Sequence, residues 1–417
     1  MPPFACIPEW RCRPLTHRFW RAALSCCLAL AFLLPLGGCS PSFRSPDQFE
    51  DLPDAYTEGA DFPERFSGSS GTVISPCEEG YYYFIDDHVY FLDGETLEST
   101  IACNKPDCIH GEDCNAYFSG WHIPFFQYYD GKLYVADIHG GPEFRTTLYE
   151  FDPESGTRKE LFEMPRYFEV NSRKYMLHRG YLYLYSLIEE DRKMRLERFP
   201  LDRMEQPESE LLYEADSYLS WGCILYGDRC IFGAFSPEDH AETLYQCNLK
   251  TGETTSILTV QDDPLGTYAV LDAIQDNSVI YHMTNDRIMS GEIPPGKTNF
   301  YAYSLTDGTN RLFYTAEEQM QNMQSNISFD GKNIMDVRMA YIMNEDPAFF
   351  AQERINLLDE NLNPVKSISP GVQLLYYNFV AGDEKVSFLY NRDAVYAVDK
   401  RDGKFEMKTL FEPEEEE

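Results

Sequence analysis

The feature that most constrains the fold is a unit of about 50 residues that recurs along the chain. Its clearest copy covers residues 128–163, YYDGKLYVADIHGGPEFRTTLYEFDPESGTRKELFE. An apolar run meets a tight turn at Asp130-Gly131, an alternating strand follows from Leu133 to Ile138, and two more strands flank the turn Pro153 to Gly156. Four short antiparallel strands with period-2 patterning predict one blade of a β-propeller.

The first hairpin turn of this unit recurs through the chain, at Gly80, Gly131, Gly180, Gly227, Asn277, Gly331 and Glu384. Regular spacing of this kind is typical of an array of structural repeats. We therefore predict an all-β fold, a β-propeller of seven four-stranded blades over residues 72–413, with six or eight blades as the alternative. The first copy (72–104) and the last (374–413) both look complete, so ring closure needs no shared blade.

The composition fits this fold and limits the partners. Hydrophobic residues make up 43% of the chain and aromatic residues 15%, enough for a large core. The formal net charge is −34. Phosphate backbones would be repelled by such a surface, so we predict no nucleic-acid partner.

The N-terminal region predicts export and a lipid anchor. Arginines precede an apolar run, Ala22 to Leu36, that is too short to span a bilayer as a mature helix. The run ends in Leu36-Gly37-Gly38-Cys39, which resembles the lipobox of bacterial lipoproteins, whose Cys is diacylated before cleavage. The resemblance implies a signal peptide over residues 1–38 and acyl chains such as palmitate on Cys39. An uncleaved anchor or a misassigned start is the alternative.

The remaining segments outside the blades are predicted to be flexible. Residues 40–71 are rich in Ser, Pro, Gly, Asp and Glu without an apolar period, so residues 39–71 are predicted to form a lipidated cysteine and a tether. Residues 414–417 are predicted to be a solvated acidic tail. The expected location is the extracytoplasmic side of the cell membrane, with the lipid on Cys39 as the membrane contact.

Loop lengths differ between the two faces of the predicted ring. The first-to-second and third-to-fourth strand turns share one face and are tight, so we call it the tight-turn face. The other, here the long-loop face, gathers longer connections. Function tends to reside on long loops held by a rigid scaffold. The candidate binding residues there are aromatic, imidazole or soft apolar, namely Tyr117, Trp121, His122, His240, Met289, Phe349 and Phe350. Alternatively, these side chains plug the channel or fold over neighbouring loops.

A cysteine-rich connection is the most distinctive local sequence. It reads CNKPDCIHGEDCNAY over residues 103–117 and holds Cys103, Cys108, His110 and Cys114. Three thiols and an imidazole can form a zinc site. The spacing lacks a close CxxC pair and exported chains are often oxidised, so a disulfide is favoured, with metal or free thiols as alternatives.

This connection also carries a family resemblance. The segment CN-PDC-H-DCNAY resembles one in surface lipoproteins of anaerobic gut bacteria that have Tyr-rich propeller domains similar to TolB-like and YncE-like propellers. The resemblance covers the lipobox, this segment and the repeat pattern. It implies a fold and a location, but no catalytic residue, since such proteins are mostly of unknown function.

No motif in the chain predicts catalysis or a cofactor. A nucleophile elbow, an H-E-x-x-H motif, a P-loop and a dinucleotide fingerprint are all absent from the sequence. We therefore predict a membrane-anchored binding or scaffold protein that presents its long-loop face to a protein or a glycan, with no cofactor and an undetermined oligomeric state. The alternative is a carbohydrate-active hydrolase or lyase with a carboxylate pair at the channel mouth.

Overall fold

The structure is a computed structural model that describes residues 45–417, apart from residues 67–72, 119–121, 140–144, 165–172, 188–192, 206, 237, 239–240, 262–266, 276, 286–296, 318–322, 341–352, 373, 375–378, 391–393 and 413–417. The chain divides into two units, Met1–Ser42 and Phe43–Glu417, and the described residues all belong to the second. Among them, no helix has the length and apolar character needed to cross a membrane.

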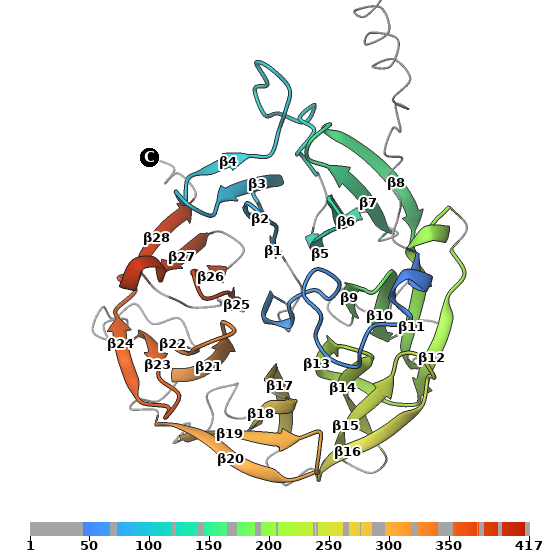
Figure 1. The fold of residues 1–417 in the computed structure, drawn as a ribbon, viewed down its shortest axis with the longest axis vertical. Helices are drawn as coiled ribbons and strands as arrows, with labels where there is room; N and C mark the ends of the chain where they lie inside the picture. Colours follow the sequence, from blue (N-terminus) through green and yellow to red (C-terminus); the bar gives the residue numbers. More distant parts are fainter. Residues whose placement is uncertain are drawn as a thin grey trace, which may run out of the picture. The chain divides into compact units, whose positions relative to one another are not determined.

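Seven four-stranded antiparallel sheets form a ring, which confirms the predicted seven-bladed propeller (Figure 1). In each sheet the first strand lies nearest the ring centre. Blades 1 to 3 consist of β1 (Ile74–Pro76), β2 (Gly80–Ile85), β3 (His88–Asp93), β4 (Ser99–Ile101), β5 (His122–Tyr129), β6 (Lys132–His139), β7 (Arg145–Asp152), β8 (Thr157–Glu163), β9 (Arg173–His178), β10 (Tyr181–Leu187), β11 (Met194–Pro200) and β12 (Glu210–Ala215).

Blades 4 to 7 repeat this arrangement. Their strands are β13 (Tyr218–Tyr226), β14 (Arg229–Ser236), β15 (Ala241–Asn248), β16 (Thr254–Gln261), β17 (Thr267–Gln275), β18 (Ser278–Asn285), β19 (Lys297–Ser304), β20 (Asn310–Glu317), β21 (Met323–Phe329), β22 (Ile334–Ala340), β23 (Arg354–Leu358), β24 (Pro364–Ile368), β25 (Phe379–Gly382), β26 (Val386–Tyr390), β27 (Val395–Asp399) and β28 (Glu406–Phe411). Four single 3-10 turns complete the described elements: η1 (Pro46–Phe49), η2 (Glu64–Phe66), η3 (Leu201–Arg203) and η4 (Arg401–Gly403).

The ring closes between blade 7 and blade 1 without a shared sheet, as predicted. The Tyr81 hydroxyl donates to the Asp383 carboxylate at 2.5 Å, and the Tyr81 ring meets the Phe388 ring edge to face at 4.9 Å. Arg401 donates to the Gly94 carbonyl at 3.2 Å. Side chains therefore replace the strand exchange that joins the ends of many propellers.

Neighbouring blades are also joined near the ring centre by buried side chains that bond to backbone. Gln127 of β5 donates to the Leu177 carbonyl and accepts from the Leu177 N–H, both at 2.9 Å. Lys174 of β9 donates to the Cys223 carbonyl at 2.6 Å. Both side chains are almost fully buried. Each such bond satisfies polar groups that the innermost strands would otherwise leave unpaired.

Turn chemistry at the tight-turn face repeats from blade to blade. At the 1–2 turns, Asp130 and Gly131 both have positive φ, as do Arg179 and Gly180, which suits two-residue turns between right-twisted strands. At several 3–4 turns, an Asp or Asn side chain ends the third strand and accepts backbone N–H bonds. Asp152 accepts from Glu154 at 2.9 Å in this way. These Asp and Asn side chains therefore stabilise hairpin turns.

Residues 45–66 correct the prediction of a flexible tether. This segment, here called the strap, packs on the tight-turn face of the propeller and crosses the centre of the ring (Figure 1). Phe66 is fully buried with Tyr81 and Phe388, between blades 1 and 7. Polar composition suggested solvation, but the aromatic residues of the strap bury apolar area, and its carboxylates find cationic partners.

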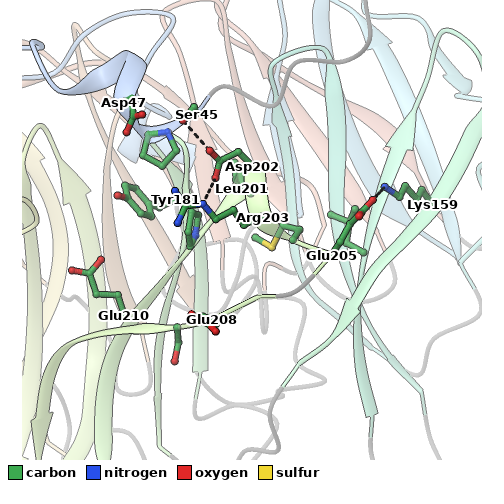
Figure 2. Close-up of a pocket in the computed structure, with 15 residues that line it drawn as sticks. Ser45, Asp47, Lys159, Tyr181, Leu201, Asp202, Arg203, Glu205, Glu208 and Glu210 are labelled. Atoms are coloured by element: carbon green, nitrogen blue, oxygen red, sulfur yellow. Dashed lines mark hydrogen bonds and ion pairs between the residues drawn. The ribbon is translucent and has the colours of Figure 1, made fainter.

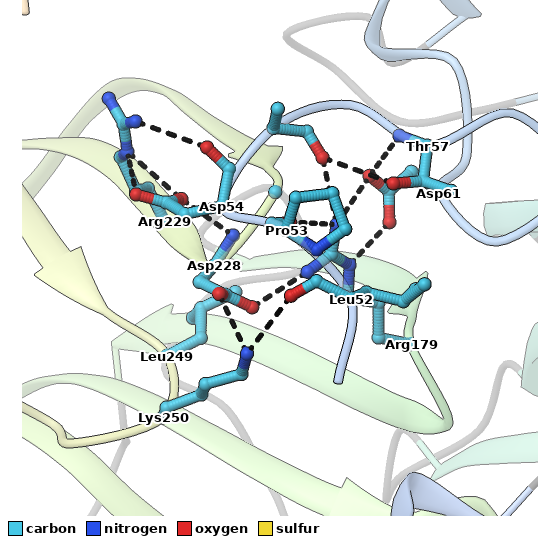
Figure 3. Close-up of polar contacts among 12 residues, drawn as sticks. Leu52, Pro53, Asp54, Thr57, Asp61, Arg179, Asp228, Arg229, Leu249 and Lys250 are labelled. Atoms are coloured by element: carbon cyan, nitrogen blue, oxygen red, sulfur yellow. Dashed lines mark hydrogen bonds and ion pairs between the residues drawn. The ribbon is translucent and has the colours of Figure 1, made fainter. Parts of the chain in front are cut away.

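Figure 3 shows how the strap is held. Arg179, in the β9–β10 turn, donates to both carboxylate oxygens of Asp61, with Nε to Oδ1 at 2.6 Å and Nη2 to Oδ2 at 3.0 Å. The same guanidinium donates to Asp228 Oδ1 at 2.7 Å and to the Ala55 carbonyl at 2.9 Å. Lys250 also pairs with Asp228, at 2.9 Å. The strap is thus fixed to blades 3 and 4 by a buried ion-pair network.

Candidate metal centre and the loop faces

The cysteine-rich loop lies on the outer edge of blades 1 and 2. Its two ends bond to the same residue: the Ala102 N–H donates to the Val89 carbonyl at 2.8 Å, and the Val89 N–H donates to the Ala116 carbonyl at 2.9 Å. Residues 103–115 therefore follow β4 and end beside the start of β3, and they extend outside the ring beside β4 (Figure 1). Asn104, at the start of the loop, contacts the β7–β8 turn of blade 2.

Four donor side chains converge within this loop. The Sγ atoms of three cysteines and a ring nitrogen of one histidine all lie within 4.8 Å of one another, from Cys103, Cys108, His110 and Cys114. Cys114 Sγ lies 3.5 Å from His110 Nδ1. The thiols of the described cysteines are free, those of this cluster included. The structure thus brings together the four residues that the sequence singled out.

The local backbone explains why the donors point inward. Asp107 and His110 have φ of 57° and 54°, left-handed conformations that reverse the chain on either side of Cys108. Ile109, between Cys108 and His110, is 95% exposed, while Cys114 is 3% exposed. The loop therefore turns its thiols and imidazole inward and the Ile109 side chain to the solvent. In most loops the aliphatic side chain would be buried instead.

The electrostatics of the cluster favour one thiolate. Burial acts to raise the pKa of the Cys103 thiol, but N–H groups of Lys105 and Asn115 and the thiols of Cys108 and Cys114 bond to its sulfur, and its pKa is lowered overall. The pKa of Cys114 is raised to about 11, first by burial and then by its two thiol neighbours, against one backbone N–H bond from Ala116. Cys103 is therefore the first of the two to ionise.

A surrounding set of hydrogen bonds fixes the loop to both blades. The His88 ring bonds through Nε2 to the His110 carbonyl at 2.8 Å and through Nδ1 to the Asp86 carbonyl at 2.7 Å. Asn104 donates to the Glu154 carbonyl of blade 2 at 2.8 Å, and Asn115 donates to Asn104 at 3.1 Å. The cluster is thus built into the junction between two blades.

The predicted binding face is described only in part. Tyr117 is half-buried, and its ring lies edge to face on the ring of His88, the first residue of β3, at 5.2 Å. His122 begins β5, opposite Ile138, but its side chain is outside the described part of the structure. Trp121, His240, Met289, Phe349 and Phe350 also lie outside the described residues.

A cleft that the sequence did not predict lies beside the start of the strap. It measures about 890 Å³ and is lined by Ser45 and Asp47 of the strap and by side chains of blades 2 and 3 (Figure 2). Ser45 donates to Asp202 at 2.9 Å, and Lys159 pairs with Glu205 at 3.7 Å. Acidic groups outnumber basic ones along its wall.

The sequence analysis also missed the residues that hold the strap. Asp61, Arg179 and Asp228 are separated by more than 40 residues from one another, and each one alone is unremarkable in a polar turn. The signal that was present is the aromatic pair Phe62 and Phe66 within a segment otherwise typical of a tether. Such residues are rarely solvated when they can be buried.

Comparisons with known proteins support the fold. No family model matches the chain, and no curated protein matches it. Among solved structures, a prolyl endopeptidase has a TM-score of 0.51 at 10% identity, over 84% of this chain and 52% of that one. A structure of a 6-phosphogluconolactonase-like protein from Bacteroides fragilis has a TM-score of 0.47 at 10% identity, over 85% of this chain and 92% of that one. At identities this low, the likeness shows the propeller fold alone.

Proposed function

We propose that this chain is a membrane-anchored, extracytoplasmic binding lipoprotein whose propeller presents its long-loop face to a protein or a glycan. Acyl chains on Cys39 would provide the anchor, since two chains are sufficient for stable membrane attachment. The propeller supplies a rigid scaffold, and the ligand would be bound by loops rather than transformed.

The observation that carries this proposal is the position of the strap. Its first described residue, Ser45, follows Cys39 by six residues, which can reach at most about 20 Å. The strap lies on the tight-turn face and is fixed there through Arg179 and Asp61. A lipid on Cys39 would therefore turn the tight-turn face to the membrane and the long-loop face away from it.

The proposed enzyme alternative has no comparable observation in its favour. The carboxylates of Asp61 and Asp228 both bind Arg179, and Lys250 binds Asp228 as well. Their role in the described structure is to hold the strap. A pair of carboxylates that served as acid and base would need an open space between them for the substrate.

Metabolic labelling tests the anchor. Wild-type protein expressed in a bacterial host that processes lipoproteins should incorporate an alkyne-bearing fatty acid and sediment with the membranes. Cys39→Ser should lose the label and be released to the soluble fraction. Cys77→Ser is a matched control, because it removes a half-buried cysteine of the propeller and should keep the label. Label that persists in Cys39→Ser would contradict the proposal.

Photo-crosslinking tests the presented face. A photoreactive amino acid at Asp87, in the exposed β2–β3 turn of the long-loop face, should capture a partner or a glycan polymer on intact cells. The same amino acid at Thr251, in the β15–β16 turn of the tight-turn face, is the control. Capture at Thr251 but not at Asp87 would contradict the proposal, because the binding surface would then lie on the tight-turn face.

A further inference from the structure

We propose that the cysteine-rich loop binds one Zn²⁺ ion and that this ion braces the junction of blades 1 and 2. The ligands are three thiolates and one imidazole, from Cys103, Cys108, Cys114 and His110. This site is independent of the proposed function, because it depends on neither the lipid anchor nor the long-loop face.

The arrangement of the donors fits a tetrahedral ion. Zinc bonds of about 2.3 Å to sulfur and about 2.0 Å to nitrogen place neighbouring S and N ligands about 3.5 Å apart and neighbouring S ligands about 3.8 Å apart. The distance from Cys114 Sγ to His110 Nδ1 is 3.5 Å, and no two of the four donor atoms are more than 4.8 Å apart. The shell would therefore be complete once each sulfur–sulfur pair shortens by at most about 1.0 Å and each sulfur–nitrogen pair by at most about 1.3 Å.

A disulfide explains less of this arrangement. It would join two sulfur atoms at about 2.05 Å and leave the third thiol and the imidazole without a role. All three thiols instead surround the same point as the His110 ring. The sequence argument for a disulfide was based on the missing CxxC pair and on the oxidation expected of exported chains. The left-handed turns at Asp107 and His110 answer the first ground, because they bring the donors together despite their spacing.

The donor set selects the metal. Thiolates and imidazole favour zinc, while calcium and magnesium require oxygen donors. All four positions would be filled by protein, which is typical of a structural zinc ion rather than a catalytic one. The proposed ion therefore needs no substrate and supplies no chemistry.

The surroundings also match those of a structural metal site. Backbone N–H groups of Lys105 and Asn115 bond to Cys103 sulfur, and that of Ala116 bonds to Cys114 sulfur, which disperses the negative charge of coordinated thiolates. The His88 ring holds the His110 carbonyl at 2.8 Å. Cys103, Cys108 and Cys114 pack at the edge of the apolar cluster that blades 1 and 2 share, while Ile109 points to the solvent, so a bound ion would link the outer part of the loop to that cluster.

Metal analysis of the full-length chain, purified in detergent under reducing conditions, tests the site. The wild-type protein should retain one zinc ion per chain through gel filtration. Replacement by Co²⁺ should produce the thiolate charge-transfer bands and strong visible bands of a tetrahedral cobalt site. Cys108→Ser should lose the zinc, whereas Cys77→Ser, which alters a cysteine outside the cluster, should keep it.

A thiol assay keeps the proposal testable if Cys108→Ser fails to fold. In the wild-type chain, three thiols should resist alkylation until a zinc chelator is added and then react together, and mass spectrometry should locate the label on Cys103, Cys108 and Cys114. Chain that binds no zinc after reduction and zinc addition would overturn the proposal. A disulfide among these cysteines in metal-free protein, as isolated, would overturn it too.

Discussion

Arg179 and Asp61, 118 residues apart in the chain, form a buried two-point ion pair that closes the strap over the propeller. Arg179 is 5% exposed, and it also binds Asp228. Removal of this guanidinium would leave two carboxylates without their buried partner, a loss of about 3 to 5 kcal/mol in comparable sites. The attachment of the strap to blades 3 and 4 should therefore depend on the Arg179 side chain.

We predict that Arg179→Met lowers the thermal midpoint and exposes the strap to limited proteolysis. Arg229→Met is the matched control, because Arg229 pairs with Asp54, which is 45% exposed, and such partly exposed pairs contribute about 1 kcal/mol or less. Equal midpoints for the two variants, or a protease-resistant strap in Arg179→Met, would show that the network does not hold this segment.

Ring closure gives a second prediction. Tyr81→Phe removes the hydroxyl that joins blade 1 to Asp383 of blade 7, a bond to a charged acceptor that contributes about 1.5 to 3 kcal/mol. Tyr83→Phe removes a bond to Ser99 within blade 1, which contributes about 1 kcal/mol. Denaturation followed by circular dichroism should show the larger loss for Tyr81→Phe, and the opposite order would contradict closure through this contact.

The buried side-chain amide of Gln127 gives a third prediction. Gln127→Leu would leave the Leu177 N–H and carbonyl without the bonds that join blades 2 and 3. Each unsatisfied buried group costs about 1 to 3 kcal/mol. Thr243→Val, which removes an exposed bond to Thr259, should cost less than about 0.5 kcal/mol. Hydrogen exchange of the Leu177 amide should accelerate in Gln127→Leu alone; an unchanged rate would count against this bridge.

Asp137 predicts a dependence of stability on pH. Burial raises its pKa to about 6, although His139 and Arg158 act to lower it and Asp87 acts to raise it. The unfolded carboxyl ionises near pH 4, so the folded state holds the extra proton between about pH 4 and pH 6, and the free energy of unfolding falls as pH rises through this window. The fall is at most about 3 kcal/mol.

Asp137→Asn should remove this fall and be more stable than wild type at pH 7. Urea denaturation from pH 4 to pH 7 measures both chains. Asp93→Asn is the control, because Asp93 is a half-buried residue at the end of β3 whose pKa is lowered, rather than raised, by hydrogen bonds from Thr96 and Glu95. Parallel curves for wild type and Asp137→Asn would mean that Asp137 ionises normally in the fold.

Much of the fold could be predicted from the sequence, because the propeller repeats one local pattern. The turn at Asp130-Gly131 and the strand that follows it, β6, depend on neighbouring residues, and both are confirmed. The strap could not be predicted, because Arg179 and Asp61 are brought together only by the closed ring. The convergence of Cys103, Cys108 and Cys114 on His110 depends on two left-handed residues that the sequence does not mark.

The orientation of the propeller on a membrane tests the central claim most directly. The lipidated chain would be placed in vesicles with a donor dye at Thr251 of the tight-turn face or at Asp87 of the long-loop face, and with acceptor dyes on the lipid headgroups. The account predicts strong energy transfer from Thr251 and weak transfer from Asp87. Equal transfer from the two positions, or stronger transfer from Asp87, would contradict it.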